Sequence, residues 1–410
     1  MRKNNIKIAL LSPIDLTFFK KYIKEKIPKK FIDLGSGPSI NSLSEELINK
    51  GHKLLIVSIS SKIKKQKIFN GKRIKIYIVP KNNNILEKIL TNLFFYNFFE
   101  IFRIIKILKK EKPNIINSHF WCELSIAAKL SGFPYLITGH DRATKVSEYY
   151  NFISNPLNKF RWFCKFYPLK FILNKTNSVS VVSNTIKDYL VSNNLFNKKI
   201  YTIPNSITVS KFKKKKVNSR FNIIVIMNGL IEFKNPKLCM QTFKLVNKDI
   251  PYAKLYMFGK DFGKNEKGFI FAKKNKLDKD IVFKGQISQD MFKKFLISRG
   301  DLLINLSLEE THSFSSIDAF SSKVPVLIYK KCEGTFDTIH KGKFGFFINS
   351  LDPFKITNLI KKLQANRGLI AKKANDAYHY ALMNLDKKKI VMQYLNLYDK
   401  KIKEFKHFKK

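Results

Sequence analysis

The stretch from Ser307 to Ile328 combines two carboxylates with a run of serines, a pattern suited to binding a phosphorylated sugar. Glu310 lies in a loop, and Asp318 follows eight residues later, in the first turns of a predicted helix. Ser313, Ser315 and Ser316 are N-cap candidates for that helix. Unpaired N–H groups and a partial positive charge at a helix N-terminus bind phosphate. Carboxylates on either side would accept hydrogen bonds from sugar hydroxyls.

Phosphate and sugar hydroxyls together describe a nucleotide-sugar, so this stretch is a candidate donor site. An ordinary helix start with solvated acids explains the same pattern, because acidic residues are favoured in the first turn of a helix. On spacing alone, both interpretations stay open.

Apolar runs typical of buried strands flank the stretch, at residues 301–306 and 324–329. A strand–loop–helix–strand unit of this kind builds a parallel sheet. The same alternation runs through both halves of the 410-residue chain. It predicts an α/β protein with two doubly wound, Rossmann-like domains and an interdomain cleft for ligands. The expected domains are residues 1–207 and 208–390, followed by a Lys-rich helix at 391–410 that packs back on the first domain.

Two groups of residues in the first half fall where a ligand is expected. His119 and His140 each follow a predicted strand, and Asp141 comes next to His140. Ligands bind at this edge of open parallel sheets, although a single histidine is more often structural. Gly35 and Gly37 precede a predicted helix, where glycine allows close approach to a phosphate or sugar. A flexible turn explains the two glycines equally well.

The net charge of +48 suggests nucleic acid or an anionic membrane as a partner. Only eight of the 78 basic residues are Arg, whereas nucleic-acid readers rely on Arg for bidentate contacts. No zinc-finger, RNA-recognition or helix-turn-helix pattern occurs. We therefore expect no nucleic-acid partner, and a Lys-enriched surface with some attraction to an anionic membrane.

A basic, aromatic helix predicted at residues 85–110 is the candidate for membrane contact. Its aromatic residues extend more than half-way round the helix, and Lys and Arg gather towards its end. Such a helix lies in a membrane interface or packs as a core helix on the sheet, and both interpretations stay open. The aromatic residues are Phe94, Phe95, Tyr96, Phe98, Phe99 and Phe102.

Other features predict the location of the protein. Met1–Asn5 lead straight into a strand, so no signal peptide is expected, and no run of 18 apolar residues predicts a transmembrane helix. The four cysteines have no metal-ligand spacing and suggest free thiols in a reducing compartment. We expect a cytoplasmic protein, peripheral on the inner face of the cytoplasmic membrane.

Eight blocks in order, covering nearly the whole chain, resemble the retaining glycosyltransferases of family 4, which have the two-domain GT-B fold. The last block, Glu310–Asp318, resembles the family's E-x7-E signature. Others are Ile116–Leu124 (INSHFWCEL), Thr138–Asp141 (TGHD), Ile203–Ile207 (IPNSI), Asn228–Asn235 and Val282–Ser288 (VFKGQIS).

The resemblance implies a glycosyltransferase that uses a UDP- or GDP-sugar, retains the anomeric configuration, and needs neither a metal nor a cofactor. The implied acceptor is a glycan or lipid-linked saccharide of lipopolysaccharide, capsule or exopolysaccharide synthesis. Two alternatives are a catalytically weakened GT-B-like protein that binds a glycan or a partner, and a sugar-phosphate synthase or epimerase of the same fold.

The resemblance also implies a role for individual residues. Lys234 would neutralise the donor diphosphate and Glu310 would hold hydroxyls of the transferred sugar. Asp318 would bind the ribose hydroxyls, and His140 would lie near the sugar and acceptor, so the implied catalytic residues are His140, Lys234 and Glu310. The other donor-side residues are Gly35, Gly37, Asn228, Gly229, Gln286, Ile287, Ser313, Phe314 and Ser315, and those on the acceptor side are His119, His140 and Asp141.

Five positions depart from the family pattern. Ser313 takes the place of a glycine, and His312 before it takes the place of an aromatic residue. Asp318 is one methylene shorter than the usual Glu. Leu230 lies near the place of a frequent Arg. Lys323 replaces a helix-ending glycine, and a positive φ there would cost about 1 kcal/mol.

Overall fold

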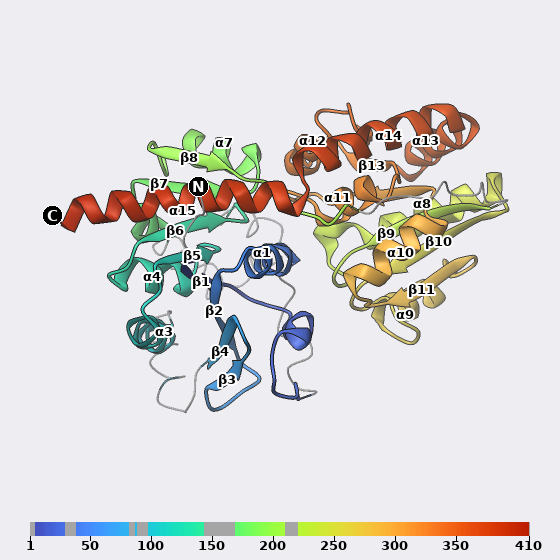
Figure 1. Cartoon of the computed structure of the whole chain (residues 1–410). Coiled ribbons are helices and arrows are strands. Elements are labelled where there is room, and N and C mark those ends of the chain that lie inside the picture. The colour runs from blue at the N-terminus through green and yellow to red at the C-terminus, as the bar shows by residue number, and fades with distance from the viewer. Residues whose placement is uncertain are drawn as a thin grey trace. The chain divides into compact units, whose positions relative to one another are not determined.

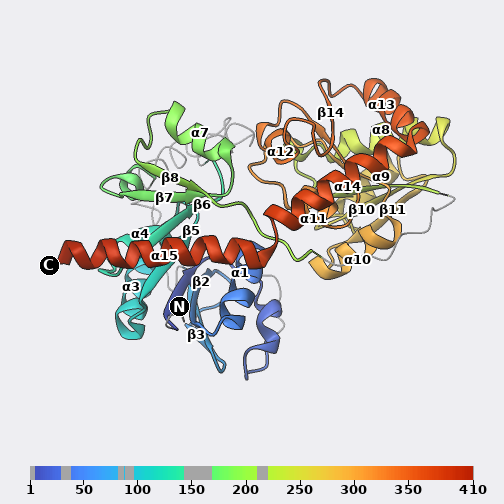
Figure 2. The same ribbon diagram turned by 45° about the horizontal axis from the view of Figure 1, so that its top comes forward.

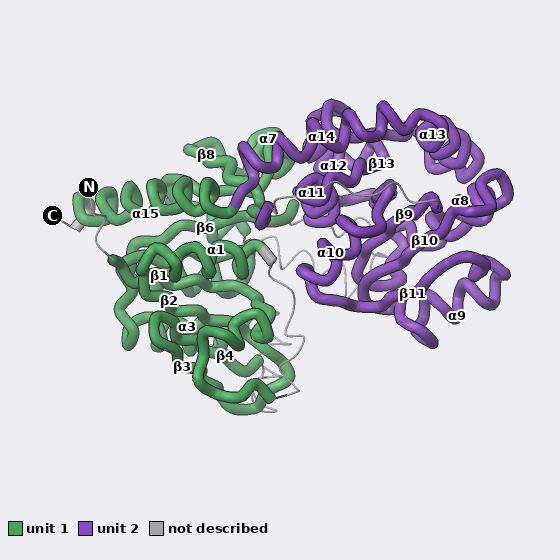
Figure 3. The backbone as a smooth tube through the Cα atoms, turned by 45° about the vertical axis from the view of Figure 1, so that its right-hand side comes forward, with its two compact units in different colours: residues 1–206, 387–410 green, residues 207–386 purple. Residues whose placement is uncertain are grey.

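The computed structural model describes residues 5–28, 38–81, 87, 97–142, 169–209 and 220–409. The chain forms two compact units, one of residues 1–206 and 387–410 and the other of residues 207–386 (Figure 3). The division between the units lies next to the expected domain boundary. The Lys-rich final helix begins at residue 387 rather than 391.

An eight-stranded sheet forms the centre of the first unit, in the order β3-β4-β2-β1-β5-β6-β7-β8. All neighbours are parallel except β3 and β4. The strand order reverses between β1 and β5, and ligands bind at such a switch point. The strands are β1 (Lys7–Leu11), β2 (Lys53–Ser60), β3 (Lys67–Asn70), β4 (Ile74–Pro80), β5 (Ile115–His119), β6 (Tyr135–Gly139), β7 (Ser178–Val181) and β8 (Lys199–Thr202).

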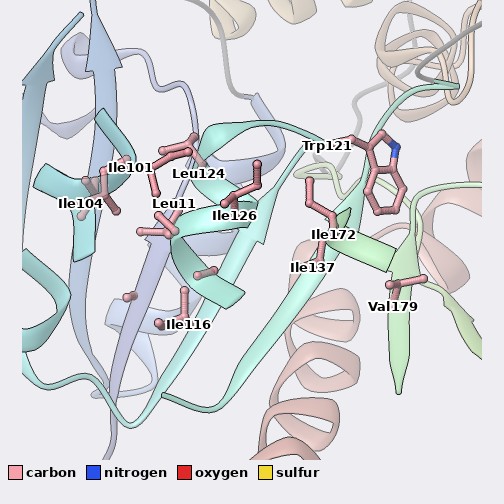
Figure 4. Close-up of a cluster of buried hydrophobic side chains, with 14 of the residues drawn as sticks. Leu11, Ile101, Ile104, Ile116, Trp121, Leu124, Ile126, Ile137, Ile172 and Val179 are labelled. Atoms are coloured by element: carbon pink, nitrogen blue, oxygen red, sulfur yellow. The ribbon is translucent and has the colours of Figure 1, made fainter. Parts of the chain in front are cut away.

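Helices cover both faces of this sheet. Ala9 and Leu11 of β1 face one layer and Ile8 and Leu10 face the other, as the two-residue period of a strand requires. The first layer consists of α3 (Phe98–Glu111), α4 (Glu123–Leu130), helical residues 169–173 and α7 (Asn184–Ser192), and Figure 4 shows its apolar core. The second layer consists of η1 (Leu16–Lys21), α1 (Pro38–Asn49) and α15 (Lys387–Lys409).

The long helix α15 belongs to the first unit although it ends the chain (Figures 1 and 2). Val391 and Leu395 are buried in the same cluster as strands β1 and β2. The buried hydroxyl of Tyr398 accepts a 2.7 Å hydrogen bond from Asn117 Nδ2. At its first turn, the Lys387 ammonium pairs with Glu45 of α1.

The second unit contains a six-stranded, all-parallel sheet in the order β11-β10-β9-β12-β13-β14. This is the strand order of a Rossmann fold, with its switch point between β9 and β12. The strands are β9 (Phe221–Ile226), β10 (Ala253–Phe258), β11 (Ile281–Gly285), β12 (Leu302–Asn305), β13 (Val326–Tyr329) and β14 (Phe346–Ile348).

Helices also cover both faces of the second sheet, so the prediction of two doubly wound α/β domains is confirmed. One layer consists of α8 (Pro236–Asp249), α9 (Lys267–Lys274) and α13 (Pro353–Ala365). The other consists of α10 (Gln289–Arg299), α11 (Phe314–Ser321), α12 (Glu333–Thr338) and α14 (Arg367–Asn384). A short 3-10 helix, η4 (Glu232–Lys234), precedes α8.

Two elements differ from the pattern expected of the sequence. The edge strand β3 was not anticipated, because Phe69 is the one buried side chain in its four residues. α3 begins after Asn97, and the aromatic residues Phe94–Tyr96 of the predicted longer helix lie outside the described residues. Among the helices that the structure describes, none has the length and apolar character needed to cross a membrane.

Candidate functional site

The two strands at the switch point of the second unit lead into the loops that carry Lys234 and Glu310. β9 ends at Ile226, eight residues before Lys234, and β12 ends at Asn305, five residues before Glu310. Because carboxyl ends of parallel strands meet at one edge, the two loops lie side by side. Lys234 Nζ donates a 2.6 Å hydrogen bond to Glu310 Oε1, and both side chains remain partly exposed, at 19% and 24%.

Main-chain contacts fix the Lys234 loop against the Glu310 loop. Asn235 has a left-handed backbone (φ 54°) that ends η4 and starts α8, and its Nδ2 donates to Leu306 O at 2.7 Å. Leu308 N donates to Phe233 O at 2.7 Å. The ion pair therefore joins two loops that are already held together.

The N-terminus of α11 lies in the same loop region as Glu310. Ser313 is its N-cap, and its Oγ accepts from Ser316 N at 3.4 Å. Asn305 Nδ2, at the end of β12, donates to Ser313 Oγ at 3.1 Å and so orients the cap. In the described part of the chain, no acceptor meets the N–H groups of Phe314 and Ser315. Ser313 thus caps the helix as predicted, and the first turn keeps donors for an anion.

The loop after β9 starts with Asn228 and Gly229. Gly229 has φ +93° and donates to Lys260 O at 3.0 Å, and Leu230 N donates to Asp261 Oδ2 at 3.3 Å. Asn228 is exposed, whereas Gly229 is buried. The positive φ explains the glycine, because other residues adopt that conformation only with strain.

Asp318 is only 4% exposed, unlike Glu310. Both of its oxygens accept from Gln289 Nε2, at 3.0 and 3.1 Å, and Lys293 Nζ lies 3.3 Å from its Oδ1. Burial raises the pKa of Asp318, although Lys293 and Gln289 oppose that shift. The predicted contact between Asp318 and ribose therefore competes with the contacts that Gln289 and Lys293 of α10 make to the same carboxylate.

Gln286 and Ile287 occupy the loop between β11 and α10. Gln286 is exposed and Ile287 is half-buried against the apolar cluster beneath α10 and α11. The predicted positions beside a base stay a prediction. Gly35 and Gly37, also predicted to face the donor, lie outside the described residues.

In the first unit the structure brings His119 and His140 together. His119 is the last residue of the switch strand β5 and His140 follows β6, and His119 Nδ1 lies 2.8 Å from His140 Nε2. Burial, and next to it His140, lower the pKa of His119 well below its usual value, so its imidazole is neutral at pH 7. His140 is half-buried and stacks on Phe120 with ring centroids 4.6 Å apart. The main chain of Asp141 is held by Trp121, whose Nε1 donates a 3.0 Å hydrogen bond to the Asp141 carbonyl oxygen.

Sequence reasoning missed Gly334, near the start of α12. A Cβ on Gly334 would lie 2.0 Å from Glu310 O, so only glycine lets α12 pack against the Glu310 loop. Asn305, Gln289 and Lys293 were also missed. A polar residue at the end of a buried apolar strand is a signal for Asn305, but nothing in the sequence marks Gln289 or Lys293.

The structure shows the local conformation or environment of two residues that depart from the family pattern, Lys323 and His312. Lys323 has φ 50°, as expected of the position where relatives have glycine. Burial, with a smaller effect of His340, lowers the pKa of His312 to about 4, so the His312 ring is neutral at pH 7.

Two family models match the chain in tandem. Residues 35–211 match "Glycosyltransferase Family 4" and residues 209–382 match "Glycosyl transferases group 1". The phosphatidylinositol N-acetylglucosaminyltransferase gpi3 subunit of Schizosaccharomyces pombe is 24% identical over 299 residues, which make up 71% of this chain and 62% of that protein. The chain thus spans about three fifths of the length of the curated relatives that it matches.

Solved structures agree on the fold. Sucrose-phosphate synthase from Thermosynechococcus elongatus superposes with a TM-score of 0.73 at 15% identity, covering 97% of this chain and 99% of that one. HepE from Anabaena, in complex with UDP and glucose, gives 0.66 at 12% identity and covers 97% of this chain and 100% of that one. At such identities the likeness concerns the fold alone.

Proposed function

This chain belongs to the family-4 glycosyltransferases, and from that membership we propose that it transfers a sugar from a nucleotide-sugar to a glycan or lipid-linked saccharide with retention of configuration. The contact between Lys234 and Glu310, beside the N-terminus of α11, is the observation that carries the proposal. It places a cation, a carboxylate and main-chain N–H donors at the edge where Rossmann folds bind ligands.

In the donor complex, the Lys234 ammonium leaves Glu310 and forms an ion pair with the diphosphate. Lys234 and the N–H groups of Phe314 and Ser315 then face the negative charge of the phosphates. Glu310, released from Lys234, accepts hydrogen bonds from hydroxyls of the transferred sugar. The donor nucleotide is UDP or GDP, and HepE, whose structure contains UDP and glucose, supports a UDP-sugar.

The reaction proceeds on one face of the sugar. The bond between the anomeric carbon and the phosphate oxygen breaks, the acceptor oxygen bonds to the same face, and the acceptor proton passes to the departing phosphate oxygen. Lys234 and the α11 N-terminus stabilise the leaving charge electrostatically. The scheme needs no metal ion, because these groups supply the positive charge.

On the acceptor side, His140 orients the hydroxyl that attacks, and His119 contacts the His140 ring. The 2.8 Å contact to a buried, neutral His119 supports a fixed orientation of the His140 ring. The acceptor belongs to a lipopolysaccharide, capsule or exopolysaccharide.

Transfer to a lipid-linked acceptor takes place at the inner face of the cytoplasmic membrane, where the protein binds peripherally. Two aromatic side chains of α3 support this, because Phe98 and Phe102 are 56% and 60% exposed. Lys106 lies 4.7 Å from the Phe102 ring, so a cation accompanies the aromatic residues as in interfacial helices. The net charge of the whole chain, +48, adds a less specific attraction to anionic lipids.

A thermal-shift panel of UDP-, GDP- and ADP-sugars tests the proposal. A ligand at 100 times its Kd stabilises a protein by about 2.7 kcal/mol, which is a shift of several degrees. One nucleotide class should stabilise the chain, and radiolabelled sugar should then appear in a lipid-linked product. Stabilisation by none of the three classes would contradict the proposal. Transfer to a free sugar phosphate instead would favour the synthase alternative.

A further inference from the structure

The carboxylate of Asp318 is enclosed by two side chains from one face of α10. Gln289 and Lys293, four residues apart and therefore on neighbouring turns, supply all three contacts, at 3.0, 3.1 and 3.3 Å. A Glu at this position would carry its carboxylate one methylene further from α11. The shorter Asp side chain leaves its oxygens next to α10.

Lys293 holds this arrangement in place. Its ammonium is buried, and besides Asp318 it donates to Thr208 O at 3.3 Å. A buried ion pair is kept only if both partners remain, because losing one leaves an uncompensated charge in the interior. The Asp318 carboxylate therefore keeps its contacts to α10 and does not turn towards a ligand.

Gln289 is the partly exposed member of the group. It is the first residue of α10, two positions after Ile287 in the loop predicted to lie beside the base. Its amide nitrogen must face Asp318, because an ionised carboxylate only accepts hydrogen bonds. Its Oε1 therefore points away from Asp318, and no donor meets it within the described part of the chain.

We propose that Gln289 Oε1, rather than the Asp318 carboxylate, accepts the hydrogen bond from a ribose hydroxyl of the donor nucleotide. Asp318 and Lys293 are positioning residues that orient the Gln289 amide. The inference rests on the proposed function, because it assigns a specificity residue to the same donor site. The amide oxygen replaces the carboxylate that the second Glu of the signature supplies in relatives.

The consequence is a measurable preference for ribose. A neutral hydrogen bond at a partly exposed site contributes about 0.5–1.5 kcal/mol, which corresponds to roughly a two- to tenfold difference in Kd. Removal of the hydroxyl from the ligand should weaken binding to the wild type by this factor. Removal of the Gln289 oxygen from the protein should abolish the difference in Kd between the ligands.

Calorimetric titration of the full chain with UDP, 2′-deoxy-UDP and 3′-deoxy-UDP tests the proposal, with the GDP series used if GDP is the better ligand. The wild type should bind one of the deoxy analogues about two- to tenfold more weakly than the parent nucleotide. Gln289→Met keeps the side-chain volume but lacks the amide, and it should bind all three ligands equally. Gln364→Ala, at a partly exposed glutamine bonded to Tyr252, should behave as the wild type.

Three outcomes would overturn the inference, and they are distinguishable. If Gln289→Met keeps the wild-type preference, another group reads the ribose. If the wild type binds the parent and both deoxy analogues equally, no protein group reads a ribose hydroxyl, and the proposed transferase function still stands. If the wild type binds no nucleoside diphosphate, the proposed function fails as well. The wild-type titration needs no substitution, so the test survives if Gln289→Met does not fold.

Discussion

Lys234 and Glu310 are separated by 76 residues in the sequence, and their side chains meet at 2.6 Å. Each follows one of the two strands at the switch point of the second unit, so the sheet topology produces the contact. A cation and a carboxylate at this edge satisfy each other in the unliganded protein. Under the proposed function, Lys234 binds the diphosphate of the nucleotide-sugar and Glu310 binds hydroxyls of its sugar.

Lys234→Ala and Glu310→Ala should each reduce turnover at least about a hundredfold, because each removes a charged contact made in the transition state. The measurement is the rate of sugar transfer at saturating donor. Lys361→Ala is the matched control, since Lys361 forms an exposed ion pair with Asp249 in the same unit. Near wild-type turnover in both site variants would refute the assigned roles.

Gly334→Ala should lower the rate of sugar transfer, measured at saturating donor, without any change to a polar side chain. The new Cβ would lie 2.0 Å from Glu310 O, so the Glu310 loop has to move. A displacement of about 1 Å at a catalytic group costs roughly a hundredfold in rate. Gly368→Ala is the control, because its Cβ would meet nothing closer than 3.8 Å. Equal activity of the two variants would show that the loop tolerates the shift.

His140→Ala should lower kcat/KM for the acceptor by about tenfold or more, because the attacking hydroxyl loses the group that orients it. Donor affinity, measured by titration with the nucleotide, should stay unchanged, since Lys234, Glu310 and the N-terminus of α11 belong to the other unit. His379→Ala, at an exposed histidine on α14, should leave both quantities at wild-type values. A loss of donor affinity in His140→Ala would assign the histidine to the donor instead.

Phe98→Ser/Phe102→Ser should weaken binding to vesicles that contain anionic phospholipid, because two exposed aromatic rings no longer enter the interface. Binding of the wild type should also decrease with salt, as expected for Lys-rich surfaces. Phe354→Ser is the matched control, being 68% exposed on the other unit. Unchanged binding of the double variant in co-sedimentation would leave diffuse charge as the cause of membrane attraction.

Glu111→Gln should destabilise the first unit in a pH-dependent way. Glu111 accepts from Lys7 Nζ and Lys75 Nζ at 2.7 Å each and from Tyr77 OH at 2.6 Å. Burial opposes ionisation, but these donors lower the pKa of Glu111 to about 2. Because the folded pKa lies below the unfolded value of about 4.3, the stabilisation is complete above that pH and disappears as the pH falls towards 2.

Calorimetric melting temperatures of the wild type and Glu111→Gln measure this effect. A loss on the order of 1–2 kcal/mol lowers Tm by about 2–6 °C at pH 7. The difference should shrink between about pH 4.3 and pH 2. Glu404→Gln removes an exposed carboxylate near Lys400 and Lys401 on α15, and should change Tm little at any pH. A Glu111→Gln difference independent of pH would show that packing, not charge, is responsible.

The sequence by itself determined the two α/β domains and the approximate place of the candidate donor site. Hydrophobic period and strand–helix alternation are local properties, and a parallel sheet has only one edge at which the loops after its strands gather. The resemblance to family 4 adds the expectation that Lys234 and Glu310 share one site, and their 2.6 Å contact agrees with it. The left-handed φ of Lys323 was predictable for a similar local reason, because it ends a helix.

Only the tertiary structure decided which side chains form hydrogen bonds and ion pairs with one another. Nothing in the spacing of Gln289, Lys293 and Asp318 indicates that α10 encloses the carboxylate, because that depends on how far each side chain reaches across packed helices. The same holds for Gly334, whose missing Cβ matters only because Glu310 O lies where that atom would be. Local pattern follows from backbone geometry over a few residues, whereas such contacts follow from packing between segments that are far apart in the chain.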